Sequence, residues 1–247
     1  MKLLVINPDS GLSEEQLSQR VACLKTVARQ DTEILMECLT NTNVCIDSLC
    51  DVAVAAPEII QKTIHAEKRG FDAVGIYCLS DPALEACREA VEIPVLGGGQ
   101  SSLQVAAGLG FGFSILTTSA RRIPEKYRFV SSSCIDTTLL KSVRSVEYDI
   151  LANRDISKDL IENRLFEMAA RCIAEDGAQV IVLGCLSFAG MGARLTERLG
   201  VPVVDPAFTL IGMAELLVSQ KLSHSKLTFP RPPARVREWG GGVFDVN

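Results

Sequence analysis

The chain has 247 residues, is 47% apolar and carries a formal net charge of −5, so it can bury one large α/β core or two smaller ones. Its mild acidity argues against a nucleic-acid-binding protein, and its apolar content argues against disorder. The N-terminal apolar stretch is too short for a signal peptide, and no run of about 18 apolar residues follows. We therefore expect a cytoplasmic protein.

Nine cysteines and two histidines are the residues most suited to disulfides or metal binding. An odd number of cysteines, spread over a long chain without an export signal, predicts free thiols. The closest spacings are Cys38-x6-Cys45-x4-Cys50 and Cys78-x8-Cys87, with no CxxC pair. We predict no metal site, and we predict that His65, in a helical pattern, and His224, near the C-terminus, are surface residues.

Short β-branched runs alternate with helical patterns along the first part of the chain. We predict strands at residues 3–7, 32–37, 72–77 and 93–97, separated by helices at about 13–29, 52–69 and 81–91. Continuous apolar runs of this length are typical of parallel strands buried on both faces. The glycine-rich stretch at 97–102 lacks the spacing of a phosphate-binding loop, so we interpret it as a turn into a helix near 100–109.

The second part of the chain repeats this pattern. Strands are predicted at residues 112–118, 142–148, 178–184 and 201–205, with helices near 119–131, 156–176 and 190–199. The pattern indicates an α/β fold of two pseudo-symmetric lobes, each an open four-stranded parallel sheet with helices on both faces. We expect the first lobe to comprise residues 1–99 and 207–247, the latter as a helix and tail, and the second lobe residues 100–206.

Two stretches support an internal duplication directly. "GFDAVGIYCLS" ends in Cys78-Leu79-Ser80, and "GAQVIVLGCLS" ends in Cys185-Leu186-Ser187, which gives an offset of 185 − 78 = 107 residues. The next predicted strand follows each cysteine at nearly the same distance, with Pro94 16 residues later and Pro202 17 residues later. The two lobes should therefore have the same topology.

The carboxyl edge of each sheet is the expected place for a ligand, because there the loops feed helices whose amides can face it. Four loops reach this edge: residues 7–10, residues 117–119, and the segments after Cys78 and Cys185. If the lobes face each other about a pseudo-twofold axis, the four loops converge on one cleft.

The residues after Cys78 predict a thiol beside a helix N-terminus. Asp81 resembles an N-cap and Pro82 a first helical residue, and such a position lowers a cysteine pKa from about 8.5 into the range of roughly 3.5 to 7.5. Cys185 is expected in a similar setting. The cysteines on predicted helices are instead expected to be small core residues; they are Cys23, Cys87 and Cys172.

A thiolate on one face of a substrate and a thiol on the other can invert a carbon stereocentre. The thiolate removes an acidified α-proton, a planar enolate forms, and the opposite thiol returns a proton to the other face. Because the reverse reaction exchanges the two roles, similar surroundings at Cys78 and Cys185 are what this chemistry requires.

Several motifs of the chain resemble those of a known family. "INPDS", "CLSDP", the "TT" at 117–118, "VLGCLS" and "VPVVD" are similar to the Asp/Glu racemase superfamily, above all its hydantoin/allantoin racemase branch, over residues 2–220. The resemblance implies flavodoxin-like lobes and a cofactor-independent isomerase that uses Cys78 and Cys185 as catalytic residues. It further implies that substrate is bound by Asn7, Pro8, Ser10, Leu79, Ser80, Asp81, Thr117, Thr118, Leu186 and Ser187.

The resemblance implies a small substrate with an acidic α C–H, no cofactor, no nucleic-acid or membrane partner, and a homo-oligomer. A hydantoin-type compound is the first candidate; aspartate or glutamate racemisation and maleate-isomerase-like chemistry are alternatives. A two-lobed protein that binds a small ligand without catalysis is an alternative of another class. Asp9 is expected to accept from a substrate N–H, to form an Asx-turn, or to cap the helix at 13–29.

Overall fold

The computed structural model describes residues 1–148 and 158–240 and the backbone of residues 242–245. The described chain divides into two compact units, Met1–Gly98 with Leu210–Asn247, and Gly99–Thr209. The limits of the two lobes that we expect from the sequence, residues 1–99 with 207–247 and residues 100–206, stay a prediction. Among the described helices, none combines the length and the apolar character needed to cross a membrane.

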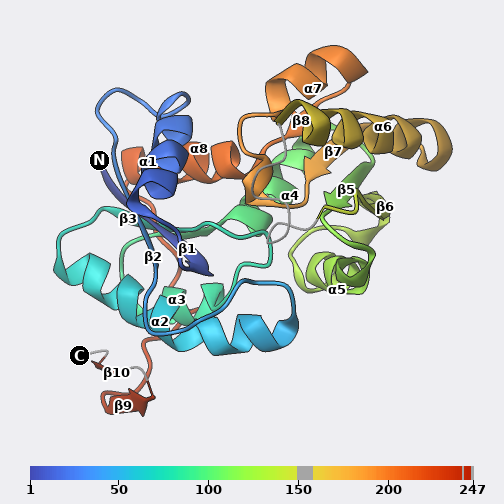
Figure 1. Ribbon diagram of the computed structural model, residues 1–247. Helices are drawn as coiled ribbons and strands as arrows, with labels where there is room; N and C mark the ends of the chain where they lie inside the picture. The colour runs from blue at the N-terminus through green and yellow to red at the C-terminus, as the bar shows by residue number, and fades with distance from the viewer. Residues whose placement is uncertain (149–157, 241, 246–247) are drawn as a thin grey trace. The chain divides into compact units, whose positions relative to one another are not determined.

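Four parallel strands in the order β2-β1-β3-β4 form the sheet of the first unit (Figure 1). The strands are β1 (Lys2–Ser10), β2 (Glu33–Leu39), β3 (Ala73–Ile76) and β4 (Val95–Gly97). The helices are α1 (Glu14–Lys25), α2 (Leu49–Lys68), α3 (Leu84–Ala90) and α8 (Pro206–Ser219), the last of which begins in the second unit. Ser13 caps α1 in a capping box with Gln16, and Ser48 caps α2.

Both faces of this sheet are covered, as the continuous apolar runs predict. On one face, Leu4 and Ile76 pack with residues of α2 and α3 such as Ile59. On the other face, Gly75 leaves room for Leu210 of α8, because a Cβ at Gly75 would lie 3.1 Å from the Leu210 side chain. The alternation of side chains along β3 therefore gives each face its own helical layer.

The second unit repeats the topology with the strand order β6-β5-β7-β8, again all parallel. Its strands are β5 (Phe113–Thr117), β6 (Leu140–Ser145), β7 (Val180–Leu183) and β8 (Val203–Val204). Its helices are α4 (Gly98–Leu109), α5 (Ile123–Ser132), α6 (Lys158–Asp176) and α7 (Gly192–Leu199), with short 3-10 helices at Ala120–Arg122, Thr137–Leu139 and Leu186–Phe188. Leu116, Ile181 and Leu183 pack against α6 and α7.

The predicted fold class is confirmed, and the strand orders make the two units topological copies. Several boundaries differ. The strand predicted at 142–148 is β6, which runs from Leu140 to Ser145, and α4 begins at Gly98 without an intervening turn. The first two residues of the helix predicted at 156–176 lie outside the described residues, and α6 begins at Lys158.

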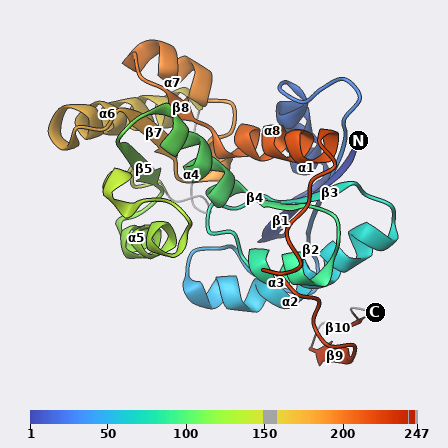
Figure 2. The ribbon, with the colours of Figure 1, turned by 180° about the vertical axis from the view of Figure 1, so that it is seen from behind.

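The C-terminal tail packs on the first unit and ends in a hairpin of β9 (Val236–Trp239) and β10 (Gly242–Asp245) that the sequence analysis did not predict (Figure 2). Lys226 donates to the carbonyls of Arg88 and Val91 at the C-terminal end of α3. Figure 2 shows the segment after α8 running past α3 towards this hairpin.

His224 is a correction to the sequence analysis, which placed it on the surface together with His65. His65 is exposed, but His224 is half-buried and its Nε2 lies 2.8 Å from the carbonyl oxygen of Val95. Burial, followed by the charge of nearby Arg88, lowers the pKa of His224 to about 4, so its ring is neutral at pH 7. The residue fixes the tail to β4.

We predict that Lys226→Met lowers the free energy of unfolding by about 1 to 2 kcal/mol, because the last carbonyls of α3 lose a charged donor. Urea unfolding followed by circular dichroism measures the change. Lys25→Met, at an exposed position of α1, is the matched control and should change stability by less than about 0.5 kcal/mol. Equal effects of the two substitutions would contradict the assigned role of Lys226.

Candidate active site

The two repeated cysteines follow equivalent strand ends. In the first unit, the amide of Tyr77 donates to Ile6 O at 2.8 Å, and in the second unit the amide of Gly184 donates to Leu116 O at 2.7 Å. Each bond extends the pairing of the two central strands by one residue beyond the ladder. The next residue is a cysteine in both units, so Cys78 and Cys185 occupy the same register position at the carboxyl edge of their sheets.

The loop after Cys78 differs from the expected helix start. Asp81 and Ala83 adopt left-handed conformations with φ of 45° and 59°, and α3 begins only at Leu84 without a side-chain cap. The prediction that Asp81 caps a helix with Pro82 at its first position is therefore wrong. Two left-handed residues turn the chain sharply, so Cys78 precedes a tight loop and not a helix N-terminus.

Asp81 is buried, and its carboxylate lies against the backbone of Gly97 at the end of β4. A Cβ at Gly97 would come within 2.3 Å of this carboxylate, so only glycine fits there. The aspartate expected to cap a helix instead holds the Cys78 loop against the neighbouring strand.

Cys185 is half-buried and directly precedes the 3-10 helix Leu186–Phe188. Its Sγ lies 3.0 Å from the hydroxyl oxygen of Ser187, and Phe188 is buried with its ring centroid 5.9 Å from that of Tyr148. The helix predicted near 190–199 is α7, which begins at Gly192, so the helix start directly beside the thiol is that of the short 3-10 helix. Within the Cys-Leu-Ser motif, the hydroxyl group beside this thiol is that of Ser187.

A buried carboxylate also holds the loop after Cys185. Asp205, which ends the "VPVVD" motif, accepts from the amide of Gly190 at 2.7 Å and from the amide of Ala207 at 3.0 Å. Its burial raises its pKa, and the hydrogen bonds from Gly190 and Ala207 act in the opposite direction. The sequence predicts this motif as a strand and gives no signal for the role of its aspartate.

The Asn7 side chain is fully buried at the carboxyl end of β1. Its Oδ1 accepts from Arg20 at 2.9 Å, and its Nδ2 donates to the sulfur of Cys38 at 3.3 Å. Pro8 beside it is buried, and the hydroxyl of Ser10 donates to Val44 O at 3.1 Å. These residues lie at the predicted edge, and the side chains of Asn7 and Ser10 bind the protein itself.

Thr117 and Thr118 occupy in the second unit the positions that Asn7 and Pro8 occupy in the first, since Ile6 and Leu116 have equivalent pairing. Thr117 is buried at the end of β5, whereas Thr118 is half-buried. Their carbonyls accept from the amides of Val146 and Tyr148. Thr118 thus has the more accessible hydroxyl of the pair.

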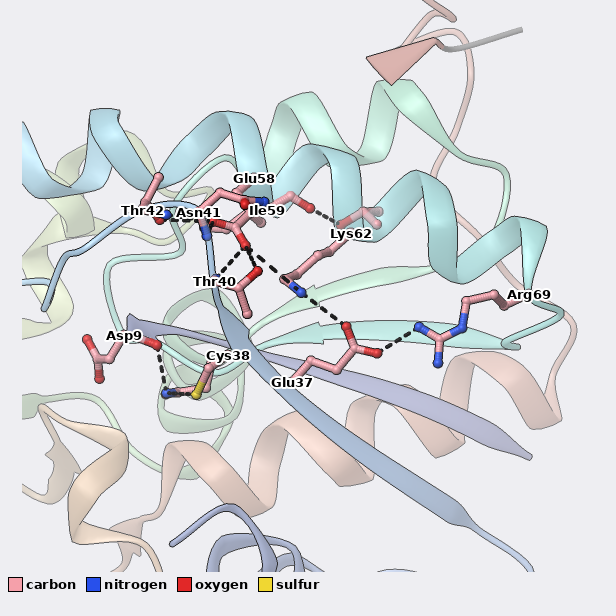
Figure 3. Close-up of polar contacts among 12 residues, drawn as sticks. Asp9, Glu37, Cys38, Thr40, Asn41, Thr42, Glu58, Ile59, Lys62 and Arg69 are labelled. Atoms are coloured by element: carbon pink, nitrogen blue, oxygen red, sulfur yellow. Dashed lines mark hydrogen bonds and ion pairs between the residues drawn. The ribbon is translucent and has the colours of Figure 1, made fainter. Parts of the chain in front are cut away.

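The loop between β2 and α2 is held by Glu58, which the sequence analysis missed (Figure 3). The carboxylate of Glu58 accepts from the amides of Thr40, Asn41 and Thr42 at 2.6 to 3.0 Å and from both threonine hydroxyls. Burial would raise its pKa, but these hydrogen bonds outweigh burial and hold the pKa below its usual value. Glu58 is therefore a buried anion that anchors three consecutive residues.

Asp9 binds the same loop farther along, because its Oδ1 accepts from the amide of Ile46 at 3.0 Å. It forms neither an Asx-turn nor the cap of α1, for which Ser13 is the N-cap. Behind the loop, Glu37 lies 3.2 Å from Lys62 and 2.7 Å from Arg69 (Figure 3). The loop is fixed to β1 through Asp9 and to α2 through Glu58.

Within the described residues, no group of three or more histidine, cysteine, aspartate or glutamate side chains could hold a metal ion. Each unit has a half-buried thiol and a tightly held loop at the carboxyl edge of its sheet, and in the second unit a hydroxyl lies beside the thiol.

A family model described as Asp/Glu/Hydantoin racemase matches residues 3–214, which is most of the chain. The chain belongs to the Asp/Glu/hydantoin racemase family. It is a racemase, and hence an isomerase, so the alternative of a binding protein without catalysis is set aside.

Individual relatives agree with this assignment. A hydantoin racemase of Rhizobium meliloti is 32% identical over 94% of this chain and 95% of its own, and one of Pseudomonas sp. (strain NS671) is 31% identical over 98% and 96%. The solved allantoin racemase from Klebsiella pneumoniae is 28% identical, superposes with a TM-score of 0.89, and is covered over 96% of its chain and 97% of this one.

Two other cysteines of this racemase differ from the repeated pair in their burial. Cys87 and Cys172 are fully buried, as expected for core residues, whereas Cys23 is half-buried. Burial raises the pKa of Cys87 to about 12 and also raises the pKa of Cys172. Buried neutral thiols of this kind are chemically inert.

We predict that Gly184→Ala inactivates the racemase and lowers its stability by about 2 to 4 kcal/mol, since a Cβ there would lie 2.2 Å from Leu116 O. The strand end beside Cys185 would have to move. Gly108→Ala, in α4 with nothing within 4 Å of the added Cβ, is the matched control and should stabilise the protein slightly. Calorimetry and racemisation rates give the readouts; a fully active Gly184→Ala protein would refute the constraint.

We predict that Glu58→Gln lowers stability by about 2 to 3 kcal/mol at pH 7, because an amide group would face backbone donors. The folded pKa of Glu58 lies below the ordinary value of 4.5, so its contribution is present above pH 4.5 and is lost as pH falls through the folded pKa.

Urea unfolding at several pH values tests this prediction. The difference between parent and Glu58→Gln should be constant above about pH 5 and shrink in acid. Glu197→Gln, at an exposed position of α7, should differ from the parent by less than about 0.5 kcal/mol throughout. A difference that grows in acid would show that the ionised carboxylate is not the stabilising form.

Proposed function

We propose that this racemase inverts a stereocentre without a cofactor, using Cys78 and Cys185 as the two acid–base groups. The observation that carries the proposal is their shared register position, one residue beyond the last central-strand hydrogen bond in both units. Both thiols are half-buried, unlike the inert core cysteines Cys87 and Cys172. A duplicated thiol at the ligand-binding edge of each sheet supports paired proton transfer.

The proposed reaction moves one proton in and one proton out. The thiolate of one cysteine takes the α-proton and becomes a thiol, and the electron pair of the C–H bond enters an enolate. The other thiol then protonates the opposite face of the planar carbon and becomes a thiolate. The product is the mirror-image substrate, and the next turnover in the reverse direction starts from the exchanged protonation states.

A hydantoin-type substrate is the class that we propose, meaning a 5-substituted hydantoin or allantoin. Its C–H is acidified by a neighbouring carbonyl, and the relatives named above are hydantoin and allantoin racemases. Hydroxyls and backbone amides at the two edges would stabilise the enolate oxygen. The proposed contacts come from Asn7, Pro8, Ser10, Leu79, Ser80, Asp81, Thr117, Thr118, Leu186 and Ser187.

The backbone of Asn7 is the proposed contact, because its side chain has a positioning role. Its carboxamide is occupied by Arg20 and Cys38, so it fixes the end of β1 beside Tyr77 and Cys78. Among the hydroxyls, Ser187 lies closest to a proposed catalytic group, at 3.0 Å from the sulfur of Cys185. A hydroxyl at this distance can stabilise the thiolate form by donating to it.

We predict that Cys78→Ser and Cys185→Ser each lower racemisation by a factor of about 10² to 10⁴, because a serine hydroxyl is too weak an acid to replace a thiol. Each variant should still exchange the α-proton of one enantiomer, and the two variants should show opposite preferences. NMR of α-deuterium uptake in D₂O, with each enantiomer tested separately, makes the measurement.

Cys134→Ser is the matched control, since Cys134 is exposed and lies outside the proposed site. It should leave racemisation within about twofold of the parent enzyme. If Cys78→Ser racemises a hydantoin at the parent rate, the two-thiol mechanism is wrong.

A further inference from the structure

A cavity of about 500 Å³ opens at the carboxyl edge of the first sheet. It lies between the end of β1 and the loop after β2, and its lining residues are Ser10, Gly11, Leu12, Cys38, Leu39, Thr40, Asn41, Thr42 and Asn43. The volume is within the range of roughly 300 to 1,000 Å³ that is usual for small-ligand sites. All of its walls belong to the first unit.

The walls of this cavity are held from behind. Glu58 binds the amides of Thr40, Asn41 and Thr42, as Figure 3 shows, and the hydroxyl of Ser10 joins the other wall to Asn43 Oδ1 at 3.1 Å. A site whose loops are fixed before binding loses little conformational entropy when a ligand enters. The hydrogen bonds therefore give the cavity a defined shape.

The cavity lies next to the proposed reaction centre within the same sheet. Cys38 lines the cavity at the end of β2, and the side chain of Asn7 in β1 donates to its sulfur. On the other side of β1, the amide of Tyr77 donates to Ile6 O, and the residue after Tyr77 is Cys78. Neighbouring strands are spaced by about 4.8 Å, so the ends of β2 and β3 are separated by roughly 10 Å across β1. A heterocycle with one substituent spans a comparable length.

The lining is uncharged and mixes polar with apolar groups. Of the nine lining residues, the five that carry a hydroxyl or a carboxamide are Ser10, Thr40, Asn41, Thr42 and Asn43, and none of the nine is charged. Within the described chain, no partner binds the carboxamide of Asn41, so that group presents both a donor and an acceptor.

This lining selects among the groups that a hydantoin can carry at its stereocentre. An alkyl or aromatic group would displace water from the Asn41 carboxamide without replacing its hydrogen bonds, and a carboxylate would meet no cation in the lining. A neutral group with both N–H and C=O, such as a ureido or carboxamide group, can pair with them.

We propose that this cavity binds the substituent of the stereocentre and selects a neutral, hydrogen-bonding group of the ureido or carboxamide type. The inference rests on the proposed function, because it places the reacting carbon beside Cys78. Asn41 is a specificity-determining residue in this assignment, and Glu58 is a positioning residue that acts through the loop.

The test compares kcat/KM for allantoin, 5-isobutylhydantoin and 5-benzylhydantoin, of which allantoin carries the ureido group. Racemisation is followed by polarimetry, and the uncatalysed rate is subtracted. The parent enzyme should prefer allantoin by a factor of 10 or more. Asn41→Leu should reduce that preference by about tenfold, chiefly by raising KM for allantoin, and should leave 5-isobutylhydantoin unaffected or improved. Asn41→Ser, which keeps a hydroxyl, should restore part of the preference.

Gln220→Leu is the matched control. Gln220 lies in the same unit just after α8, and its carboxamide is exposed. The last residues of α8 line a different cavity, together with Met1. This variant should keep the parent ratio. A parent enzyme that favours the alkyl or benzyl compound, or an Asn41→Leu ratio within twofold of the parent, overturns the inference while the proposed racemisation stands. Failure to racemise any of the three hydantoins refutes the proposed function and the inference together.

Discussion

The hydrogen bonds that close the central strand pair of each sheet fix the position of both repeated thiols. The amides of Tyr77 and Gly184 bind the last carbonyls of their neighbours, Ile6 and Leu116, in the same way. Each face of the first sheet packs against its own helices, so a register shift of one residue, which would exchange the two faces, is strongly disfavoured. Duplication of this pairing therefore duplicates the thiol at a defined place.

Carboxylates from elsewhere in the fold hold the loops at this edge. Glu58 and Asp9 bind the loop after β2, Asp205 binds the loop after Cys185, and Asp81 lies against the end of β4. Glu58, Asp9 and Asp205 accept hydrogen bonds from loop amides outside the helices and strand ladders, where unpaired amides would be costly to bury. Irregular loops can thereby be as well ordered as the sheets that carry them.

Most of the fold can be predicted from the sequence because the signals for its helices and strands are local. Apolar runs and the Cys-Leu-Ser repeat predict two parallel sheets and the equivalent positions of Cys78 and Cys185, and the strand orders agree. The family resemblance agrees with the matched family model.

The parts that were missed depend on residues distant in the sequence. Glu58 reads as an ordinary helix residue until the loop residue Thr40 folds over it, and the partner of His224 is Val95, far earlier in the chain. The prediction of a helix start directly after Cys78 was wrong for another reason. Asp-Pro is typical of a helix start, yet the left-handed conformations of Asp81 and Ala83 delay the helix by two residues, a choice that tertiary contact with Gly97 decides.

The chain's division into units has a consequence for its synthesis. The second unit is a continuous segment, Gly99–Thr209, whereas the first unit needs both ends of the chain. One face of its sheet, at Gly75, is covered by Leu210, and the end of α3 is bound by Lys226. On a ribosome that adds roughly 5 to 20 residues per second, the second unit has its whole sequence first. The half with the N-terminus, and Cys78 within it, is completed last.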